Sequence, residues 1–357
     1  MSKIVLSAML LCAALALPAR AQPSAGQASP YAGIVAAAER EGALEVHGTT
    51  DRREVGALLD GFRARYPALR VDYAELGSDE LAARIAAGAS SADLAWSSAM
   101  DLQIRLVNDG FAQSYASPEA ANLPAWAVWR QQAFGTTIEP VVTVYNARLL
   151  ARAAVPRSHA ELTRLLSEQP ATYQGRLATY DPERSGVGFL LLTQDIDIAR
   201  RNWDLVRAMS QVGVKLYSSS GTMLDRVAAG DQLLAYNILG SYALERARQD
   251  PSLGLVYPSD YTLTVSRIAF IPRTAPHPNA ARLFLDFLLS RDGQRHLAAR
   301  SMGPVREDLQ SEAEAAIPAT ARAAMRPIRL GPELLTYLDQ AKRSLFLREW
   351  RRALQGR

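Results

Sequence analysis

Cysteine is almost absent from this sequence, because Cys12 is the only one among 357 residues. It lies in an apolar N-terminal stretch that carries the features of a removable export signal. A chain that loses this stretch has no disulfide, no catalytic thiol and no cysteine ligand for a metal. A protein of this length buries a large core without such covalent links, and its size suggests two domains.

Long apolar runs are also scarce, and the exception is at the N-terminus. Lys3 precedes an almost wholly apolar stretch over residues 4–17, and Ala19-Arg20-Ala21 offers a small-x-small site. These three features are typical of a secretory signal peptide. A transmembrane anchor is the alternative, but the run is short for the ~20 residues that a span needs. We predict that residues 1–21 are a signal peptide, cleaved to leave Gln22 first, and that the mature protein is periplasmic.

Charge of one sign is not in excess either. The formal net charge is +4, and Lys3 and Arg20 carry two of these charges, so the predicted mature chain is near +2 (4 minus 2). Basic residues are dispersed, except for a short C-terminal group at Arg348, Arg351, Arg352 and Arg357. Such a group is typical of a solvated helix face. Because the chain lacks a basic patch, we expect no nucleic-acid partner.

Enzyme signatures are missing. The sequence has no G-x-x-x-x-G-K-[ST] phosphate loop, no G-x-S-x-G nucleophile turn and no H-E-x-x-H zinc motif. The four histidines show no paired spacing on a helix; they are His47, His159, His277 and His296. We therefore expect a protein that is not an enzyme, with no resident metal and no cofactor. A periplasmic hydrolase or lyase is a weak alternative, since no nucleophile or metal set supports it.

Strand-like and helix-like segments alternate from Tyr31 onward. Short apolar runs over residues 43–47, 69–73 and 92–96 are each followed by a polar turn and an amphipathic stretch. The repetition of strand, turn and helix is typical of a parallel sheet that is covered on both faces. The sequence therefore predicts an α/β fold.

A second block repeats this pattern after a β-branched run over residues 140–146. An alternating run over residues 263–271 could return the chain to the first block. Two blocks that are joined by strands suit two lobes and a hinge. We predict a first lobe from residues 30–140 plus 262–305. The second lobe would hold residues 141–261 plus 306–357, including the C-terminal helices.

Polar residues cluster where the predicted strands end and helices begin. In open α/β sheets, ligands bind at the carboxyl ends of strands, and helix N-termini offer free N–H groups to anions. Plain N-capping by serine and threonine is the alternative at each position. As a set, these positions favour a polar ligand cleft. The candidate ligand-binding residues are Thr49, Thr50, Ser97, Ser98, Ser185, Gly186, Ser219, Asn237 and Tyr242.

Five segments together resemble one family of proteins. The chain is similar to the periplasmic solute-binding proteins of ABC importers, of the ferric-iron and phosphorylated-organic type. The resemblance implies a two-lobed type II periplasmic binding fold with a hinge and an interlobe cleft. It also implies an ABC permease as the membrane partner, and we expect a monomer. The segments are LEVHGTTD at 44–51, ADLAWSSAMDLQ at 92–103, YDPERSGVG at 180–188, YNILGSY at 236–242 and ARLFLDFLL at 281–289.

The ligand is less well defined than the fold. Ferric members of this family use two adjacent tyrosines, whereas here Ser241 precedes Tyr242. Thr49 and Thr50 stand where such members carry a histidine. The hydroxyls and glycines that are present match relatives that bind a small organic anion, such as a sugar phosphate, a phosphonate or a carboxylate. A ferric-iron carrier and a ligand-presenting partner of a membrane histidine kinase remain as alternatives.

Overall fold

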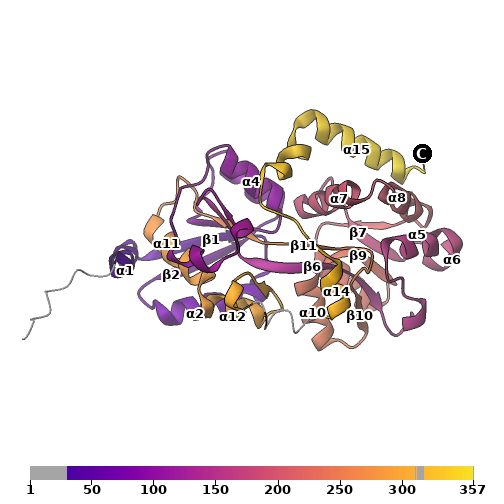
Figure 1. Cartoon of the computed structure of the whole chain (residues 1–357), viewed down its shortest axis with the longest axis horizontal. Coiled ribbons are helices and arrows are strands. Elements are labelled where there is room, and N and C mark those ends of the chain that lie inside the picture. The colour runs from indigo at the N-terminus through magenta and orange to yellow at the C-terminus, as the bar shows by residue number, and fades with distance from the viewer. Residues whose placement is uncertain (1–29, 310, 312–316, 357) are drawn as a thin grey trace, which may run out of the picture.

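The structure is a computed structural model that describes residues 30–309, 311 and 317–356. The predicted signal peptide, residues 1–21 with Cys12, lies outside the described residues. The described chain forms two lobes that lie side by side along the long axis of the molecule (Figure 1). Each lobe is built on its own β-sheet with helices around it, so the predicted two-lobed α/β fold is confirmed.

The sheet of the first lobe has six strands in the order β2-β1-β3-β12-β5-β4. β1 is parallel to both β2 and β3, whereas β12 runs antiparallel to β3 and β5. The carboxyl ends of β1 and β3 therefore meet at one edge of this sheet. The strands are β1 Ala43–Gly48, β2 Arg70–Glu75, β3 Leu94–Ser97, β4 Val128–Trp129, β5 Ala133–Gly135 and β12 Ile268–Phe270.

Amphipathic helices cover this sheet. In α2, the buried residues Val55, Leu58, Leu59 and Phe62 follow helical spacing, so one stripe faces the core. The Phe62 ring meets those of Phe284 and Phe287, with centroids 5.0 and 5.4 Å apart. The helices are α1 Pro30–Glu41, α2 Arg52–Arg65, α3 Ser78–Ala86, α4 Met100–Asn108, η1 Pro118–Asn122, η2 Ala125–Ala127, α11 Pro278–Leu289, α12 Arg291–Ala298 and η4 Glu307–Leu309.

The sheet of the second lobe follows the order β14-β11-β6-β9-β7-β8, and β10 and β13 also pair with β6. β7 is parallel to β8 and β9, and β6 is antiparallel to β9. The long β6 reaches from the middle of the molecule into this lobe (Figure 1). The strands are β6 Thr137–Asn146, β7 Leu177–Tyr180, β8 Lys215–Tyr217, β9 Leu234–Leu239, β10 Leu253–Val256, β11 Thr262–Val265, β13 Gly303–Pro304 and β14 Met325–Pro327.

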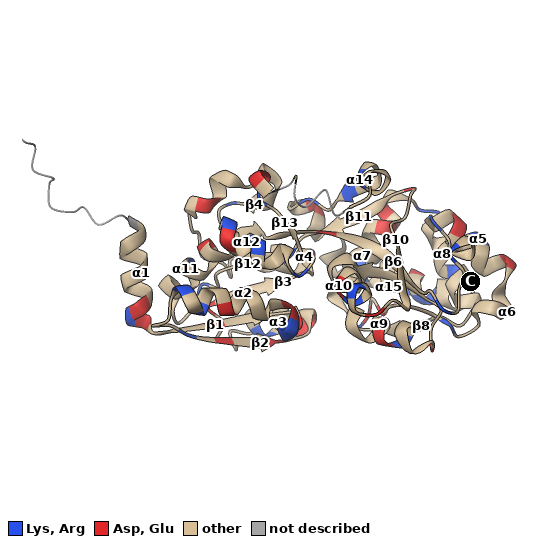
Figure 2. Cartoon of the chain, turned by 90° about the horizontal axis from the view of Figure 1, so that it is seen from below, with Lys and Arg blue, Asp and Glu red and all other residues tan. Residues whose placement is uncertain are grey.

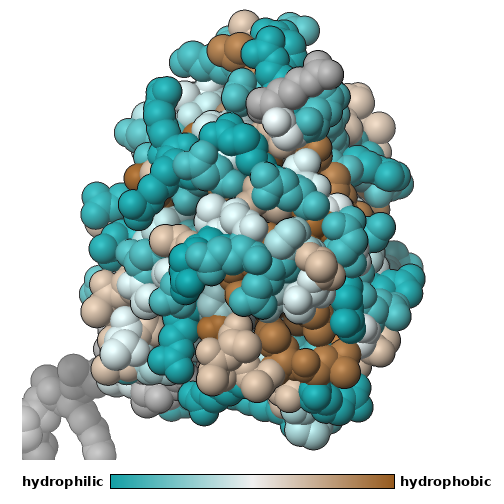
Figure 3. Space-filling view, turned by 90° about the vertical axis from the view of Figure 1, so that its right-hand side faces the viewer, coloured by the Kyte–Doolittle hydropathy of each residue, from teal (hydrophilic) through white to brown (hydrophobic). Residues whose placement is uncertain are grey.

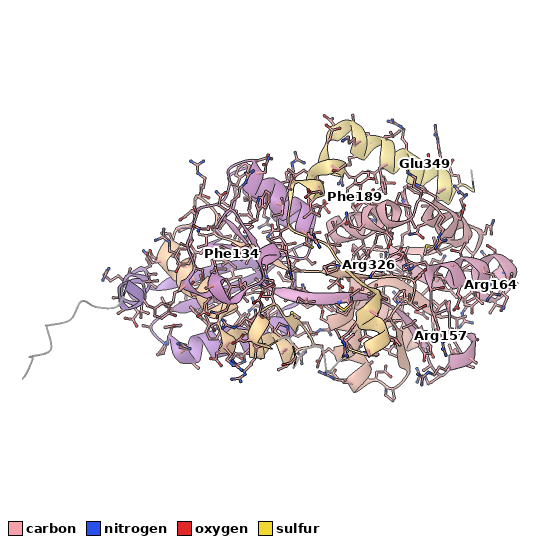
Figure 4. The ribbon with its side chains drawn as sticks, in the orientation of Figure 1. Phe134, Arg157, Arg164, Phe189, Arg326 and Glu349 are labelled. Atoms are coloured by element: carbon pink, nitrogen blue, oxygen red, sulfur yellow. The ribbon has the colours of Figure 1, made fainter. Side chains whose placement is uncertain are left out.

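The last helix, α15, lies over α7 and α8 at the top of the second lobe in Figure 1. Phe189 of α7 packs beneath it, as Figure 4 shows, in a cluster with Phe346 and Trp350. The helices of this lobe are η3 Arg152–Ala154, α5 His159–Glu168, α6 Pro170–Tyr173, α7 Gly186–Ile198, α8 Asn202–Gln211, α9 Ser220–Ala229, α10 Gly240–Gln249, α14 Ala319–Ala324, η5 Pro332–Leu338 and α15 Gln340–Leu354.

The chain passes between the two sheets in three places: from β5 to β6, from β11 to β12, and from α12 to β13. The alternating run over residues 263–271 is not one strand, because it breaks at Ser266 and Arg267 between β11 and β12. The buried Arg267 side chain holds the chain at this break through an ion pair with Glu139 of β6. Within the predicted first-lobe segment 262–305, β11 and β13 pair with β6, so the residue boundaries of the lobes stay a prediction.

Positively and negatively charged side chains are not separated into different regions of the surface. Figure 2 shows Lys and Arg interspersed with Asp and Glu along both lobes. The end of the second lobe is mostly hydrophilic, with one small hydrophobic patch low on the right of Figure 3. Within residues 30–309, 311 and 317–356, no helix has the length and apolarity that crossing a membrane requires.

Candidate ligand-binding site

A polar cavity of about 380 Å³ lies between the two lobes. The first lobe contributes the ends of β1, β2 and β3 and the start of α3, and the second lobe contributes the starts of α7, α9 and α10. One wall includes Thr49, Asp51, Glu75, Ser78 and Ser98, and the other includes Arg184, Ser185, Ser219, Gly221 and Tyr242, with Arg267 between them.

The first-lobe wall begins where β1 and β3 end. Because these strands are parallel neighbours, the residues that follow them lie together. The Thr49 hydroxyl donates to Ser97 Oγ at 3.2 Å, and the Ser98 N–H approaches Thr49 Oγ1 at 3.4 Å. The Ser98 side chain is only 4% exposed, lines the cavity and has no partner for its hydroxyl in the described chain. This hydroxyl is therefore available to a ligand.

The second-lobe wall is made by the first turns of α7 and α9. Ser185 caps α7 by accepting from the Gly188 N–H at 3.2 Å, and Ser219 caps α9 by accepting from the Thr222 N–H at 3.3 Å. Both serines are thus N-caps and cavity residues at the same time. An N-cap satisfies only some of the free N–H groups of a first turn, and those that remain attract anions.

Two of these remaining N–H groups belong to Val187 and Gly221. Neither donates to any residue in the part of the chain that the structure describes. Arg184 stands beside α7, is exposed, and forms no ion pair with a described acidic residue. Together these groups give the second-lobe wall a positive electrostatic character.

The two lobes touch along the rim of the cavity. The Gly186 N–H donates to Ser78 Oγ at 3.1 Å, which joins α7 to α3. The Tyr242 hydroxyl lies 3.1 Å from both Asp51 Oδ1 and the Asp51 N–H. Burial raises the pKa of Tyr242, so this hydroxyl stays protonated and can donate to the carboxylate. The lobes are therefore closed on each other in this structure.

A buried ion pair forms the floor between the lobes. Arg267 Nε lies 2.8 Å from Glu139 Oε1, and Nη2 donates to Oε2 at 3.0 Å. Arg267 Nη1 also donates to Thr50 Oγ1 at 2.6 Å, and its guanidinium lies 5.6 Å from the centre of the Tyr242 ring. Both charged side chains are almost fully buried. Arg267 therefore brings no net charge to the cavity, because Glu139 neutralises it.

Five of the nine predicted site residues line this cavity: Thr49, Ser98, Ser185, Ser219 and Tyr242. Thr50, Ser97 and Gly186 are close by, but they support the wall instead of lining it. Thr50 is fully buried and binds Arg267, and Ser97 accepts hydrogen bonds from its neighbours. That these residues bind a ligand remains a proposal.

Asn237 lies elsewhere in the second lobe. Its backbone is left-handed, with φ of 62°, and its amide donates to Asp195 Oδ2 at 2.6 Å. Asp195 also accepts from Tyr236 and Tyr261, each at 2.9 Å, in a buried polar cluster under α7. The asparagine thus satisfies a buried carboxylate and does not reach the interlobe cavity.

Arg184 could be proposed from the sequence as a partner for the ligand, but the sequence interpretation missed the other three charged groups of the cavity, Asp51, Glu75 and Arg267. Asp51 follows the threonine pair and immediately precedes α2, so its position at a helix start was a usable signal. Arg267 was detectable as a charged residue within an apolar run. Glu75 ends an exposed edge strand and carried no such signal.

The described residues do not offer a ready metal centre. Among them, no group of three His, Cys, Asp or Glu side chains is arranged to hold a metal ion. Ser241, which precedes Tyr242, is buried and hydrogen bonds to Glu139.

Comparison with known proteins gives the same two-lobed arrangement. A substrate-binding protein of an ABC transporter from Agrobacterium tumefaciens is 38% identical, with a TM-score of 0.82, over 87% of this chain and 94% of that one. Iron-bound HitA from Pseudomonas aeruginosa is 20% identical, with a TM-score of 0.70, over 87% of this chain and 99% of its own.

A third structure widens the range of ligands among the relatives. AfuA from Actinobacillus pleuropneumoniae, solved with fructose-6-phosphate, is 18% identical, with a TM-score of 0.69, over 87% of this chain and 98% of its own. At such identities, the last two structures support only the fold. A search of curated proteins found no match.

The family model of bacterial extracellular solute-binding proteins matches residues 54–300, which is more than half of the chain. This segment contains most elements of both lobes and the cavity wall apart from Thr49 and Asp51. It also contains the three passages between the sheets, apart from the end of the last. The fold, the interlobe cavity and this match agree. The chain belongs to the family of bacterial extracellular solute-binding proteins.

Proposed function

We propose that this protein captures a small anionic organic solute in the periplasm and delivers it to the permease of an ABC importer. The family is extracellular by description, and the Agrobacterium relative is the binding subunit of an ABC transporter. The predicted signal peptide supports the same location. Sugar phosphates, phosphonates and carboxylates are the classes that we expect to bind.

One observation carries the proposal. The first turns of α7 and α9 face the interlobe cavity with the N–H groups of Val187 and Gly221, which have no acceptor among the described residues. Arg184 stands beside them and forms no ion pair within the same part of the chain. Such turns stabilise a negative charge through their dipoles, and a guanidinium adds a charge-assisted bond. The unpartnered Ser98 hydroxyl on the opposite wall completes a set of donors that a bound acid group can use.

A thermal-shift screen tests the proposed ligand class. The mature protein is heated with sugar phosphates, phosphonates, carboxylic acids, neutral sugars and ferric citrate. A ligand at one hundred times its dissociation constant stabilises the fold by about 2.7 kcal/mol, which raises the midpoint by several degrees. We expect at least one organic acid to do so. Stabilisation by neutral sugars alone, or by ferric citrate with a visible tyrosinate band, contradicts the proposal.

Substitution of Arg184, compared with a control arginine, tests where the acid group binds once a ligand is found. Arg184→Gln should weaken binding roughly tenfold or more, since a hydrogen bond to a charged group contributes about 1.5–3 kcal/mol. The matched control is Arg157→Gln, because Arg157 is exposed at the far end of the second lobe, as Figure 4 shows. Calorimetry should give unchanged affinity for the control. Equal loss in both variants would mean that Arg184 has no special contact.

A further inference from the structure

The two walls of the cavity carry charges of opposite sign. The first lobe contributes the carboxylates of Asp51 and Glu75, and the second lobe contributes the guanidinium of Arg184. Arg267 is neutralised by Glu139, as described above. The cavity therefore presents two carboxylates, of which Asp51 has a 3.4 Å contact with Arg53, and one guanidinium, that of Arg184, without an ion pair among the described residues. A ligand with only negative charge would be repelled by the first-lobe wall.

The Asp51 side chain faces the cavity and does not cap α2. It occupies the N-cap position of α2, yet its side chain makes no capping hydrogen bond. Its Oδ1 accepts from the Tyr242 hydroxyl at 3.1 Å instead. Its Oδ2 has only a 3.4 Å contact with Arg53, whose side chain is largely exposed. This carboxylate keeps the capacity to accept further hydrogen bonds.

Glu75 brings a second carboxylate to the same helix terminus. Its Oε2 accepts from the Arg52 N–H, the first amide of α2, at 2.8 Å. Its other oxygen has no partner among the described residues. The two acids therefore flank one helix N-terminus, where the helix dipole favours negative charge.

The second-lobe wall provides what an acid group needs, and on the first-lobe wall the hydroxyl of a buried residue, Ser98, points to a ligand independently of the helix termini. Ser98 is 4% exposed, lines the cavity, and leaves its hydroxyl without a partner in the described chain. Buried hydroxyls normally have a partner. A ligand that bridges the walls supplies one.

We propose that the solute is a small zwitterion, with its acid group at the first turn of α7 beside Arg184 and its ammonium group at Asp51 and Glu75. This inference rests on the proposed function and narrows it. A protonated amine donates to both carboxylates and offsets their negative charge. A hydroxyl at the same place donates one hydrogen bond and leaves that charge uncancelled.

Matched pairs of small acids, identical except for an amine or a hydroxyl, test this assignment by titration calorimetry. The pairs are phosphoethanolamine with 2-hydroxyethyl phosphate, β-alanine with 3-hydroxypropionate, and taurine with isethionate. We expect the amine member of at least one pair to bind tenfold or more tightly than its partner.

Two variants assign this preference to the first-lobe wall. Glu75→Gln keeps an oxygen for the Arg52 N–H, and Asp51→Asn keeps one for Tyr242, so both should fold. Each should reduce the amine preference to less than about threefold. Asp72→Asn on the same strand is the control, because Asp72 is exposed and pairs with Arg70, and it should leave the preference unchanged.

The outcomes separate the two proposals. If the hydroxy acids bind as tightly as the amines, or if the preference survives in both variants, the zwitterion assignment is wrong while capture of an organic acid stands. If no member of any pair binds, and neutral sugars or ferric citrate stabilise the protein instead, both proposals are overturned.

Discussion

Asp101 is a carboxyl group that the fold buries at the start of α4. It is only 3% exposed, and its Oδ1 accepts from the Leu102 N–H at 2.9 Å. Burial raises the pKa of Asp101 from 3.8 to about 7, and the negative Asp79 acts in the same direction. The Leu102 N–H and the positive Arg343 oppose this rise without cancelling it.

A raised pKa makes stability depend on pH in a definite direction. The folded protein holds a proton on Asp101 that the unfolded chain has already lost, so this group stabilises the fold fully below pH 4. That contribution disappears as the pH rises through about 7. The loss between pH 5 and pH 8 is about 2–3 kcal/mol, at about 1.4 kcal/mol for each pKa unit.

Asp101→Asn should therefore remove this part of the pH dependence. Relative to the natural chain, the variant should gain about 2–3 kcal/mol at pH 8 compared with pH 5, measured by urea unfolding at both values. Asp109→Asn, an exposed position at the end of the same helix, serves as the control. Identical pH slopes for the natural chain and Asp101→Asn would show that the buried carboxyl does not titrate in this range.

Gly186 lies where α7 of the second lobe contacts the first lobe. A Cβ atom at this position would lie 2.7 Å from Leu102 Cδ1 and 2.9 Å from Ser78 Oγ, both in the other lobe. Overpacking of this kind costs about 1–3 kcal/mol, and here the cost falls on the closed arrangement. The inside of each lobe is not affected.

We expect Gly186→Ala to open the lobes while leaving each of them folded. Small-angle scattering should give a larger radius of gyration, and affinity for the solute should fall about tenfold. Gly56→Ala is the matched control, because a Cβ atom there meets nothing within 4 Å. A radius of gyration equal to that of the natural chain would contradict the expectation.

At the scale of single residues, the sequence could locate the wall but not the direction of each side chain. Thr49 and Thr50 are adjacent, and the backbone turns one to the cavity and the other to Arg267. Asn237 depends on a left-handed backbone and on Asp195, which is distant in sequence. Such choices are made by tertiary contacts that a strand or turn pattern does not contain.

The C-terminal helix α15 is held by aromatic packing against the second lobe. Trp350 is 2% exposed, and Phe346 meets Phe189 of α7 with ring centroids 5.6 Å apart. The Arg343 guanidinium lies 4.2 Å from the centre of the Phe189 ring. Burial of large apolar groups is the main favourable contribution to docking of such a helix.

Trp350→Ala should destabilise the protein by about 3–5 kcal/mol, as expected for removal of a large buried side chain. Urea unfolding measures the change. Arg348→Ala, on an exposed face of the same helix, should change stability by less than about 0.5 kcal/mol. A small effect of Trp350→Ala would mean that α15 contributes little to the stability of the lobe.

At the scale of elements, the alternation of strand and helix was predictable because it repeats with short turns. β1, α2, β2, α3, β3 and α4 follow the predicted order of the first block. The break between β11 and β12 coincides with Arg267, which interrupts the apolar alternation of Leu263 and Val265, but the sequence does not show which residue the arginine pairs with. A buried ion pair with β6, more than a hundred residues earlier, fixes that break.

At the scale of the whole molecule, Arg300 links the lobes outside the cavity. It donates to Glu54 of α2 and to Glu245 of α10, each at 2.8 Å, so one cation joins a carboxylate from each lobe. Both carboxylates are nearly buried, while Arg300 is about 25% exposed. Without Arg300, two negative charges face each other across the interface.

Arg300→Met should therefore favour separation of the lobes. The effect should be on the order of 2 kcal/mol, less than the 3–5 kcal/mol of a fully buried pair, because solvent reaches Arg300. Scattering at low and high salt measures the opening, which should diminish as salt screens the two acids. Arg295→Met, an exposed site on the preceding helix, is the control. Unchanged scattering at low salt would refute a role for Arg300 in holding the lobes.

The three passages of the chain between the sheets have a mechanical consequence. Two lobes that are joined by several neighbouring segments move mainly by bending about one hinge axis and resist twisting about the long axis of the molecule. We therefore expect each closing movement to bring the same atoms together, Ser78 with Gly186 and Asp51 with Tyr242. We then expect the closed cavity to have one shape, which the protein fixes, and a solute to bind according to its fit to that shape.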